Sequence, residues 1–109
     1  MINEEVKIIN RIYESVMKMD KYKYNSFEYE YVLNKDEGWV SMGLIYKLNN
    51  SIVLQNDFKY VDSDLLEELS EQLKITMFKH TGGEWTKFIL LFENNEIKTK
   101  FEYQPQSLI

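Results

Sequence analysis

The sequence of 109 residues contains no cysteine, one proline, four glycines and one histidine. Without cysteine the protein cannot form disulfide bonds, use a thiolate nucleophile or bind zinc through cysteine ligands. With His80 as its single histidine, it also cannot build a metal centre from several histidines. The fold must therefore depend on a hydrophobic core, and a chain of this length is large enough to form one without cross-links.

Long apolar segments are also absent. No stretch approaches the roughly 20 apolar residues that a membrane-spanning helix needs. The first residues, MINEEVKIINRIYE, mix acidic and apolar side chains and do not resemble a signal peptide. We therefore expect a cytoplasmic protein that does not contact a membrane.

Positive charge is scarcer than negative charge, with 13 Lys and Arg against 18 Asp and Glu and a net charge of −5. The excess is concentrated in one stretch that has a single basic residue, Lys59, and six acidic ones. The acidic residues are Asp57, Asp62, Asp64, Glu67, Glu68 and Glu71. An acidic surface disfavours direct binding of nucleic acid and favours a basic partner. The alternative is a solvated helix end, because acidic residues there complement the helix dipole and keep a protein soluble.

Aromatic residues make up 15% of the sequence, which favours β-strands. Residues 26–33 alternate in polarity, with Glu28 and Glu30 on one face. The other face has Phe27, Tyr29, Tyr31 and Leu33. A loop ending in glycine leads into a second alternating strand over residues 39–48. Gly43 inside this strand predicts a bulge or a close backbone approach.

Three further strands are predicted. Residues 51–54 form a short third strand, and residues 55–60 a loop. The stretch 84–92 is the most apolar strand, which predicts an interior or covered position. A turn through Asn94-Asn95 then leads to an alternating strand over residues 97–103.

Two amphipathic helices are predicted, over residues 2–19 and 62–79. The first has an apolar stripe formed by Ile2, Val6, Ile9, Tyr13 and Val16, with Ile12 and Met17 or Met19 beside it. Its polar face, which includes Glu5, is predicted to be solvated. The second begins with Asp62 as its N-cap and ends before Gly82-Gly83, where a left-handed C-cap is expected. Its apolar stripe is formed by Leu66, Leu69, Leu73 and Met77. Asp64, Glu67, Glu68 and Glu71 lie on the opposite face.

The element order is therefore α-β-β-β-α-β-β, without a repeat or a linker. This order predicts one α+β domain over residues 1–109. We expect a single antiparallel sheet of about five strands with two helices packed on one face.

No catalytic constellation is visible in the sequence. His80 lies where the second helix ends, so we expect it to interact with the last helix carbonyls. Glu28 and Glu30 are two apart on one strand face, roughly 7 Å from each other by strand rise. Such a pair suits acid–base chemistry or a hard cation, but a solvated outer surface explains it more simply. We predict no catalytic activity, no cofactor and no metal site.

Two segments resemble the YezG-like immunity (antitoxin) family. They are LLEELSEQLK at 65–74 and EWTKFILLFENNEIKTKFEY at 84–103. In that family an acidic helix precedes a strand that begins with Trp, a turn, and a strand that ends in an aromatic residue, an acid and Tyr. The corresponding positions are Trp85, Phe88, Phe92, Phe101, Glu102 and Tyr103.

The resemblance implies an immunity protein of the bacterial cytoplasm. Such a protein neutralises a toxin, typically a basic nuclease, by occluding its active or nucleic-acid-binding site. The expected partner-binding residues are then the six acids between Asp57 and Glu71, with Glu28 and Glu30 as a further acidic surface. The alternatives are a small ligand-binding or enzymatic domain that uses the concave face of the sheet, and an adaptor domain without a toxin. A homodimer is compatible with each alternative.

Overall fold

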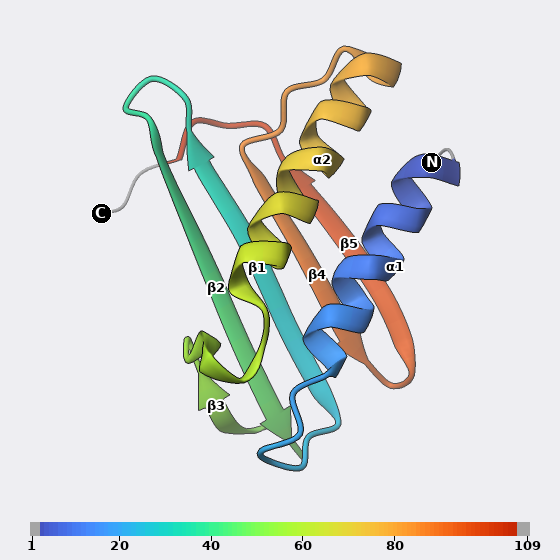
Figure 1. The fold of residues 1–109 in the computed structure, drawn as a ribbon, viewed down its shortest axis with the longest axis vertical. Helices are drawn as coiled ribbons and strands as arrows, with labels where there is room; N and C mark the ends of the chain where they lie inside the picture. The colour runs from blue at the N-terminus through green and yellow to red at the C-terminus, as the bar shows by residue number, and fades with distance from the viewer. Residues whose placement is uncertain (1–2, 107–109) are drawn as a thin grey trace.

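The computed structural model describes residues 3–106 and has the predicted α+β architecture. Two helices lie on the same face of one five-stranded antiparallel sheet (Figure 1), as the sequence predicted. In chain order the elements are α1 (Asn3–Met17), β1 (Ser26–Asn34), β2 (Trp39–Leu48), β3 (Ser51–Gln55), the 3-10 helix η1 (Phe58–Tyr60), α2 (Ser63–Thr81), β4 (Lys87–Glu93) and β5 (Glu96–Glu102). No helix in this described part of the chain is long and apolar enough to cross a membrane.

The strand order is β3-β2-β1-β4-β5, so β1 lies at the centre of the sheet. Three pairs of consecutive strands form hairpins: β1 with β2, β2 with β3, and β4 with β5. The pairing of β1 with β4 joins distant parts of the chain and places Phe27 opposite Phe92. The most apolar strand, β4, is interior as predicted. It is not covered on both faces, because Ile89 and Leu91 on the helix-free face are only half-buried.

Gly43 marks a close approach and not a bulge. The β1–β2 register continues through it, with Gly43 opposite Glu30. A methyl group at residue 43 would lie 3.3 Å from Glu30 Cγ, so a larger residue would displace that side chain. The register shift in β2 lies instead between Tyr46 and Lys47, where it pairs with β3.

Helix α2 has the predicted caps. The Asp62 carboxylate accepts a hydrogen bond from the Leu65 N–H at 3.0 Å, as an N-cap does. Gly82 is left-handed, with φ of 73°, and its N–H donates to the Phe78 carbonyl at 2.9 Å. The predicted stripe of Leu66, Leu69, Leu73 and Met77 is buried.

Helix α1 is rotated relative to the prediction. Val6 was expected on the apolar stripe, but its side chain is 42% exposed. The buried positions are Glu5, Ile9, Ile12 and Val16, spaced by four, three and four, with Ser15 beside them. This face places Ile12 at its centre and brings the Glu5 carboxylate under α2, so Glu5 does not belong to the solvated face. Ile2 of the predicted stripe lies outside the described residues.

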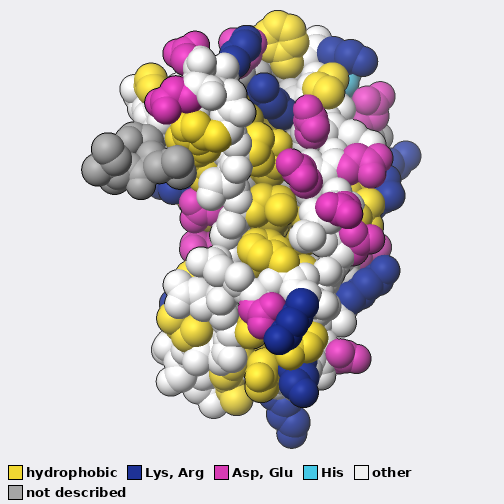
Figure 2. Space-filling model, turned by 60° about the vertical axis from the view of Figure 1, so that its left-hand side comes forward, with side chains coloured by type: hydrophobic (Ala, Val, Ile, Leu, Met, Phe, Trp, Pro, Cys, Tyr) yellow, Lys and Arg dark blue, Asp and Glu magenta, His cyan; other side chains and the backbone are white. Residues whose placement is uncertain are grey.

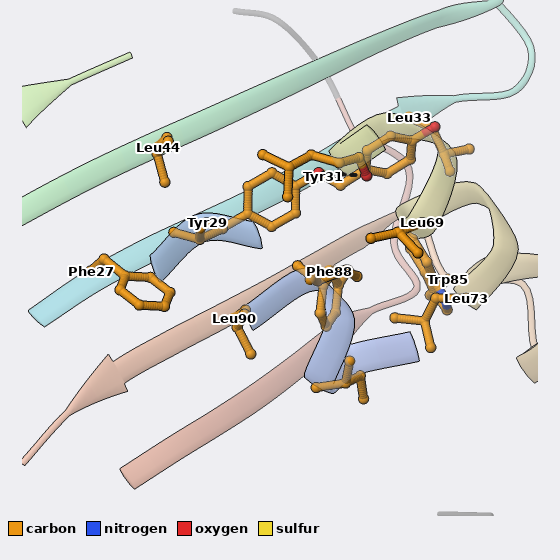
Figure 3. Close-up of a cluster of buried hydrophobic side chains, with 14 of the residues drawn as sticks. Phe27, Tyr29, Tyr31, Leu33, Leu44, Leu69, Leu73, Trp85, Phe88 and Leu90 are labelled. Atoms are coloured by element: carbon orange, nitrogen blue, oxygen red, sulfur yellow. Dashed lines mark hydrogen bonds between the residues drawn. The ribbon is translucent and has the colours of Figure 1, made fainter. Parts of the chain in front are cut away.

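Aromatic side chains fill the space between the helices and the sheet (Figure 3). The largest fully buried residues include Trp85, Tyr29, Tyr46, Phe27 and Phe88. Two of the phenols also fasten helices to the sheet. The Tyr29 hydroxyl lies 2.7 Å from Ser70 Oγ on α2, and the Tyr46 hydroxyl donates to the Val16 carbonyl of α1 at 2.6 Å. Burial raises the pKa of both Tyr29 and Tyr46, so these phenols stay protonated and able to donate.

Candidate partner-binding surfaces

The strongest concentration of charge lies on the solvent side of α2. Its carboxylates recur at helical spacing, and all are exposed. They belong to Asp64, Glu67, Glu68 and Glu71, which we call the acidic face. Within residues 3–106, none of the ion pairs between side chains involves any of these four residues. Their charge is therefore available to a partner.

Asp57 and Asp62 do not contribute in the same way. Asp57 accepts a hydrogen bond from the Lys59 N–H and lies 3.7 Å from Lys59 Nζ, so it caps η1 and has a cation beside it. Asp62 caps α2 through the Leu65 N–H. Both residues were predicted to bind a partner. In the structure each one caps a helix through a hydrogen bond from a nearby backbone N–H.

The two strand carboxylates lie on the opposite face of the sheet. Glu28 and Glu30 point away from the helices, and Glu30 Oε1 is 3.7 Å from Lys87 Nζ. Together with Asn56 they line a shallow depression of about 260 Å³. Since the sheet separates this depression from α2, Glu28 and Glu30 form a surface apart from the acidic face.

His80 is placed differently from its prediction. Its Nδ1 atom lies 3.9 Å from the Oε1 atom of the buried Glu5 carboxylate, so it contacts α1 and not the last carbonyls of its own helix. The end of the helix is instead satisfied by Gly82 and by the Thr81 hydroxyl, which donates to the Met77 carbonyl at 2.8 Å. In the described part of the chain, no three His, Asp or Glu side chains gather as metal ligands would.

A groove beside the acidic face was not predicted. It has a volume of about 200 Å³ and lies between α2 and the start of β2. Its lining includes Tyr31, Leu33, Trp39, Val40, Glu71 and Lys74. Figure 2 shows this side of the molecule, with a column of hydrophobic side chains next to a group of acidic ones.

Tyr31 links the groove to the acidic face. The side chain is 3% exposed, yet its hydroxyl takes part in none of the hydrogen bonds formed within residues 3–106. Burial, followed by the charges of Glu71 and Glu67, raises the pKa of Tyr31 to about 12. The phenol is therefore a protonated donor that faces the field of two carboxylates.

The groove could have been suspected from strand lengths. The predicted third strand has four residues and the second has ten. A strand of four residues can cover less than half of one side of the second strand, so the rest of that side must pair with another strand or remain an open edge. The sequence does not state which strand lies on that side, because strand order depends on contacts distant in sequence.

No protein-family profile matches the sequence, and no curated protein matches it either. The resemblance to YezG-like immunity proteins therefore stays a prediction from the segments at 65–74 and 84–103.

Proposed function

We propose that this protein is an immunity protein of the bacterial cytoplasm that binds and neutralises a protein toxin. The toxin is a nuclease with a basic nucleic-acid-binding surface. The immunity protein occludes that surface or the active site beside it, without chemical turnover.

The observation that supports this proposal most directly is the acidic face of α2. Its four carboxylates lie on one helix and have no cationic partner within residues 3–106. A fixed group of like charges attracts a basic surface from a distance and accelerates association. The same charges repel nucleic acid, so this protein would not bind the substrate of the nuclease. It would instead occupy the groove in which the nuclease holds that substrate.

The first test is neutralisation. Candidate toxins are nucleases encoded beside the gene for this protein, produced with and without it in the same cells. We expect full protection of cells that contain both proteins, and loss of nuclease activity when the purified proteins are mixed. If the neighbouring toxins remain fully active with an excess of this protein, the proposal is wrong.

The second test locates the contact. Glu67→Lys combined with Glu71→Lys should weaken toxin binding, slow association and reduce its dependence on salt. Each lost contact is expected to cost roughly 0.5–3 kcal/mol, depending on how far it is buried. The free energy of unfolding should change by no more than about 0.5 kcal/mol, because both side chains are exposed.

A matched control separates this effect from net charge. Glu14→Lys combined with Glu96→Lys makes the same charge change at exposed sites on α1 and β5. Affinities and association rates are measured at two salt concentrations for the wild type and both double variants. Equal losses in the two variants would show that net charge alone matters, and the interface would then be sought around Glu28 and Glu30.

A further inference from the structure

The outer edge of β2 is open over half its length. The strand pairs with β1 from Trp39 to Lys47, but β3 pairs only with the part that begins at Ile45. The pairing with β3 is extended by one residue, because Asn56 exchanges hydrogen bonds with the Leu44 N–H and carbonyl at 2.9 and 2.7 Å. Within the described residues, the segment 39–43 has no strand on its outer side.

The outward backbone groups can be assigned from this contact. Successive residues of an antiparallel strand direct their N–H and C=O groups to alternate sides. Since Leu44 bonds outward to Asn56, Met42 and Val40 also direct both groups outward. Within residues 3–106 these two donors and two acceptors have no hydrogen-bond partner, and they lie in the register that an added strand requires.

The open segment of β2 and the edge strand β5 differ in how they are protected against pairing with another chain. The edge strand β5 contains Lys98 and Lys100, and charged side chains of this kind discourage pairing between chains. The open segment of β2, WVSMG, has neither a charge nor a proline. It is an edge without the usual devices that prevent strand addition.

The groove beside the open edge also favours particular side chains on an added strand. Val40 is 45% exposed and lies opposite Leu33, while Met42 lies opposite Tyr31. Tyr31 also lines this groove, and its hydroxyl has no hydrogen-bond partner within residues 3–106. An added strand would cover the exposed apolar surface and offer a carbonyl or side-chain acceptor to this phenol.

Charge varies along the groove. Lys74 and Glu71 both line the groove with Val40, and at the hairpin end Lys35 is paired with Glu84 at 3.0 Å. Toward Met42, Glu67 adds its negative charge to that of Glu71, since both carboxylates act on Tyr31, the residue opposite Met42. The Val40 end therefore suits an apolar side chain, and the Met42 end suits a basic one.

We propose that an extended segment of the partner protein adds to the open edge of β2 as a sixth strand. On the helix side this segment presents an apolar residue over Val40 and, two positions away, an Arg or Lys over Met42 that reaches Glu67 and Glu71. The aliphatic part of the basic side chain covers Met42 while its charged end meets the carboxylates. This inference rests on the proposed function for the basic character of the partner.

A second copy of this chain fits the edge less well. Two copies joined through their β2 edges about a perpendicular two-fold axis would have both α2 helices on the same side of the continuous sheet. The two acidic faces would then flank the junction and repel each other. A basic partner has no such cost.

The probe is a short peptide with leucine and arginine two residues apart among threonines, and a matched peptide with glutamate in place of arginine. Backbone amide NMR of the full chain should show shifts and slower hydrogen exchange at Val40 and Met42. The glutamate peptide should bind roughly tenfold more weakly or worse, since it meets like charges. Absence of binding at millimolar peptide, or shifts confined to other residues, would overturn the inference.

Val40→Pro removes an outward N–H without removing a bond to β1, and should abolish peptide binding. Thr99→Pro makes the equivalent change on β5 and should leave binding unaltered. If the proline variant unfolds, as judged by circular dichroism, Val40→Lys places a charge on the same edge and should weaken binding as strongly. Binding that survives a folded Val40 variant would refute strand addition.

Toxin assays separate this inference from the proposed function. Neutralisation that is lost in the Glu67→Lys, Glu71→Lys variant but unchanged in the Val40 variants would support an immunity protein and refute strand addition. Specific peptide binding at Val40 and Met42 without any neutralised toxin would support the edge site and refute the function. A dimer of the free protein that Val40→Pro dissociates would assign the edge to a second copy and overturn the inference.

Discussion

The hydrogen bond between Tyr29 and Ser70 should contribute measurably to stability, because it is the buried polar link between β1 and α2. Both side chains have no exposed surface, and their oxygens are 2.7 Å apart. A buried hydrogen bond of this kind typically contributes about 1 kcal/mol, and more is lost when one partner remains unsatisfied. The perturbations are Tyr29→Phe, Ser70→Ala and the two combined.

The surroundings determine the size of each loss. In Tyr29→Phe the Ser70 hydroxyl can turn to the Leu66 carbonyl one helical turn back, so we expect a loss of about 1 kcal/mol. In Ser70→Ala the phenol retains only the Leu66 carbonyl and Met42 Sδ, each at 3.4 Å, so we expect a loss of about 1–2 kcal/mol. The double variant should lose about 1 kcal/mol less than the sum of the single variants.

Urea unfolding at neutral pH measures these free energies, with tryptophan fluorescence as the signal and an unchanged m-value as evidence that the unfolded state is the same. One kcal/mol corresponds to a shift of about 4 °C in Tm for a domain of this size. Tyr24→Phe is the control, since that hydroxyl donates to the Met17 carbonyl in an exposed position and should cost less than about 0.5 kcal/mol. Additive losses in Tyr29→Phe and Ser70→Ala would refute the coupling that the geometry implies.

Three further changes test other features of the fold. Gly82→Ala should cost about 1 kcal/mol from backbone strain alone, because φ is 73° and a methyl group there meets no atom within 4 Å; a urea midpoint equal to that of the wild type would contradict the left-handed cap. Trp85→Phe should change the unfolding free energy by no more than about 1 kcal/mol. The lost ring volume destabilises the core, but the change also removes a buried indole N–H that has no acceptor within residues 3–106. A loss of 3 kcal/mol or more, roughly that of a cavity-forming change to Ala, would contradict this. Stability should fall as pH rises from about 10 to about 12, because the folded state holds the proton of Tyr31, and those of the buried Tyr29 and Tyr46, more tightly than the unfolded state does. Urea unfolding measures the free energy of unfolding at each pH. Its decrease per pH unit should be smaller by about 1.4 kcal/mol in Tyr31→Phe than in the wild type, and an equal decrease would refute the raised pKa of Tyr31.

Local features of the sequence predict most of the elements. The period-two alternation of residues 26–33 and 39–48 specifies which side chains face the core, and the structure confirms both strands to within one residue. Asp62 and Gly82 specify the ends of α2 because their preferred conformations differ from the helix itself. These signals are contained within a few neighbouring residues.

Contacts between distant segments are not predictable in the same way. The pattern of α1 allows a stripe through Val6 or one through Glu5, and only packing against α2 selects the second, where His80 lies near the carboxylate. The same limit applies to the candidate site. Spacing along one helix predicts that Glu67 and Glu71 lie together, but the open β2 edge beside them follows from the strand order.

The pairing of β1 with β4 also has a consequence for synthesis of the chain. Strand β1 ends at Asn34, and the strand that completes its second side ends at Glu93, about 60 residues later. At typical translation rates the ribosome needs roughly 3–12 seconds to add that length. During this time the aromatic central strand has one bare side and lacks α2 above it, which is a state prone to aggregation. Nascent chains that stall before β4 would be substrates for chaperones, because the fragment lacks the strand that closes the centre of the sheet.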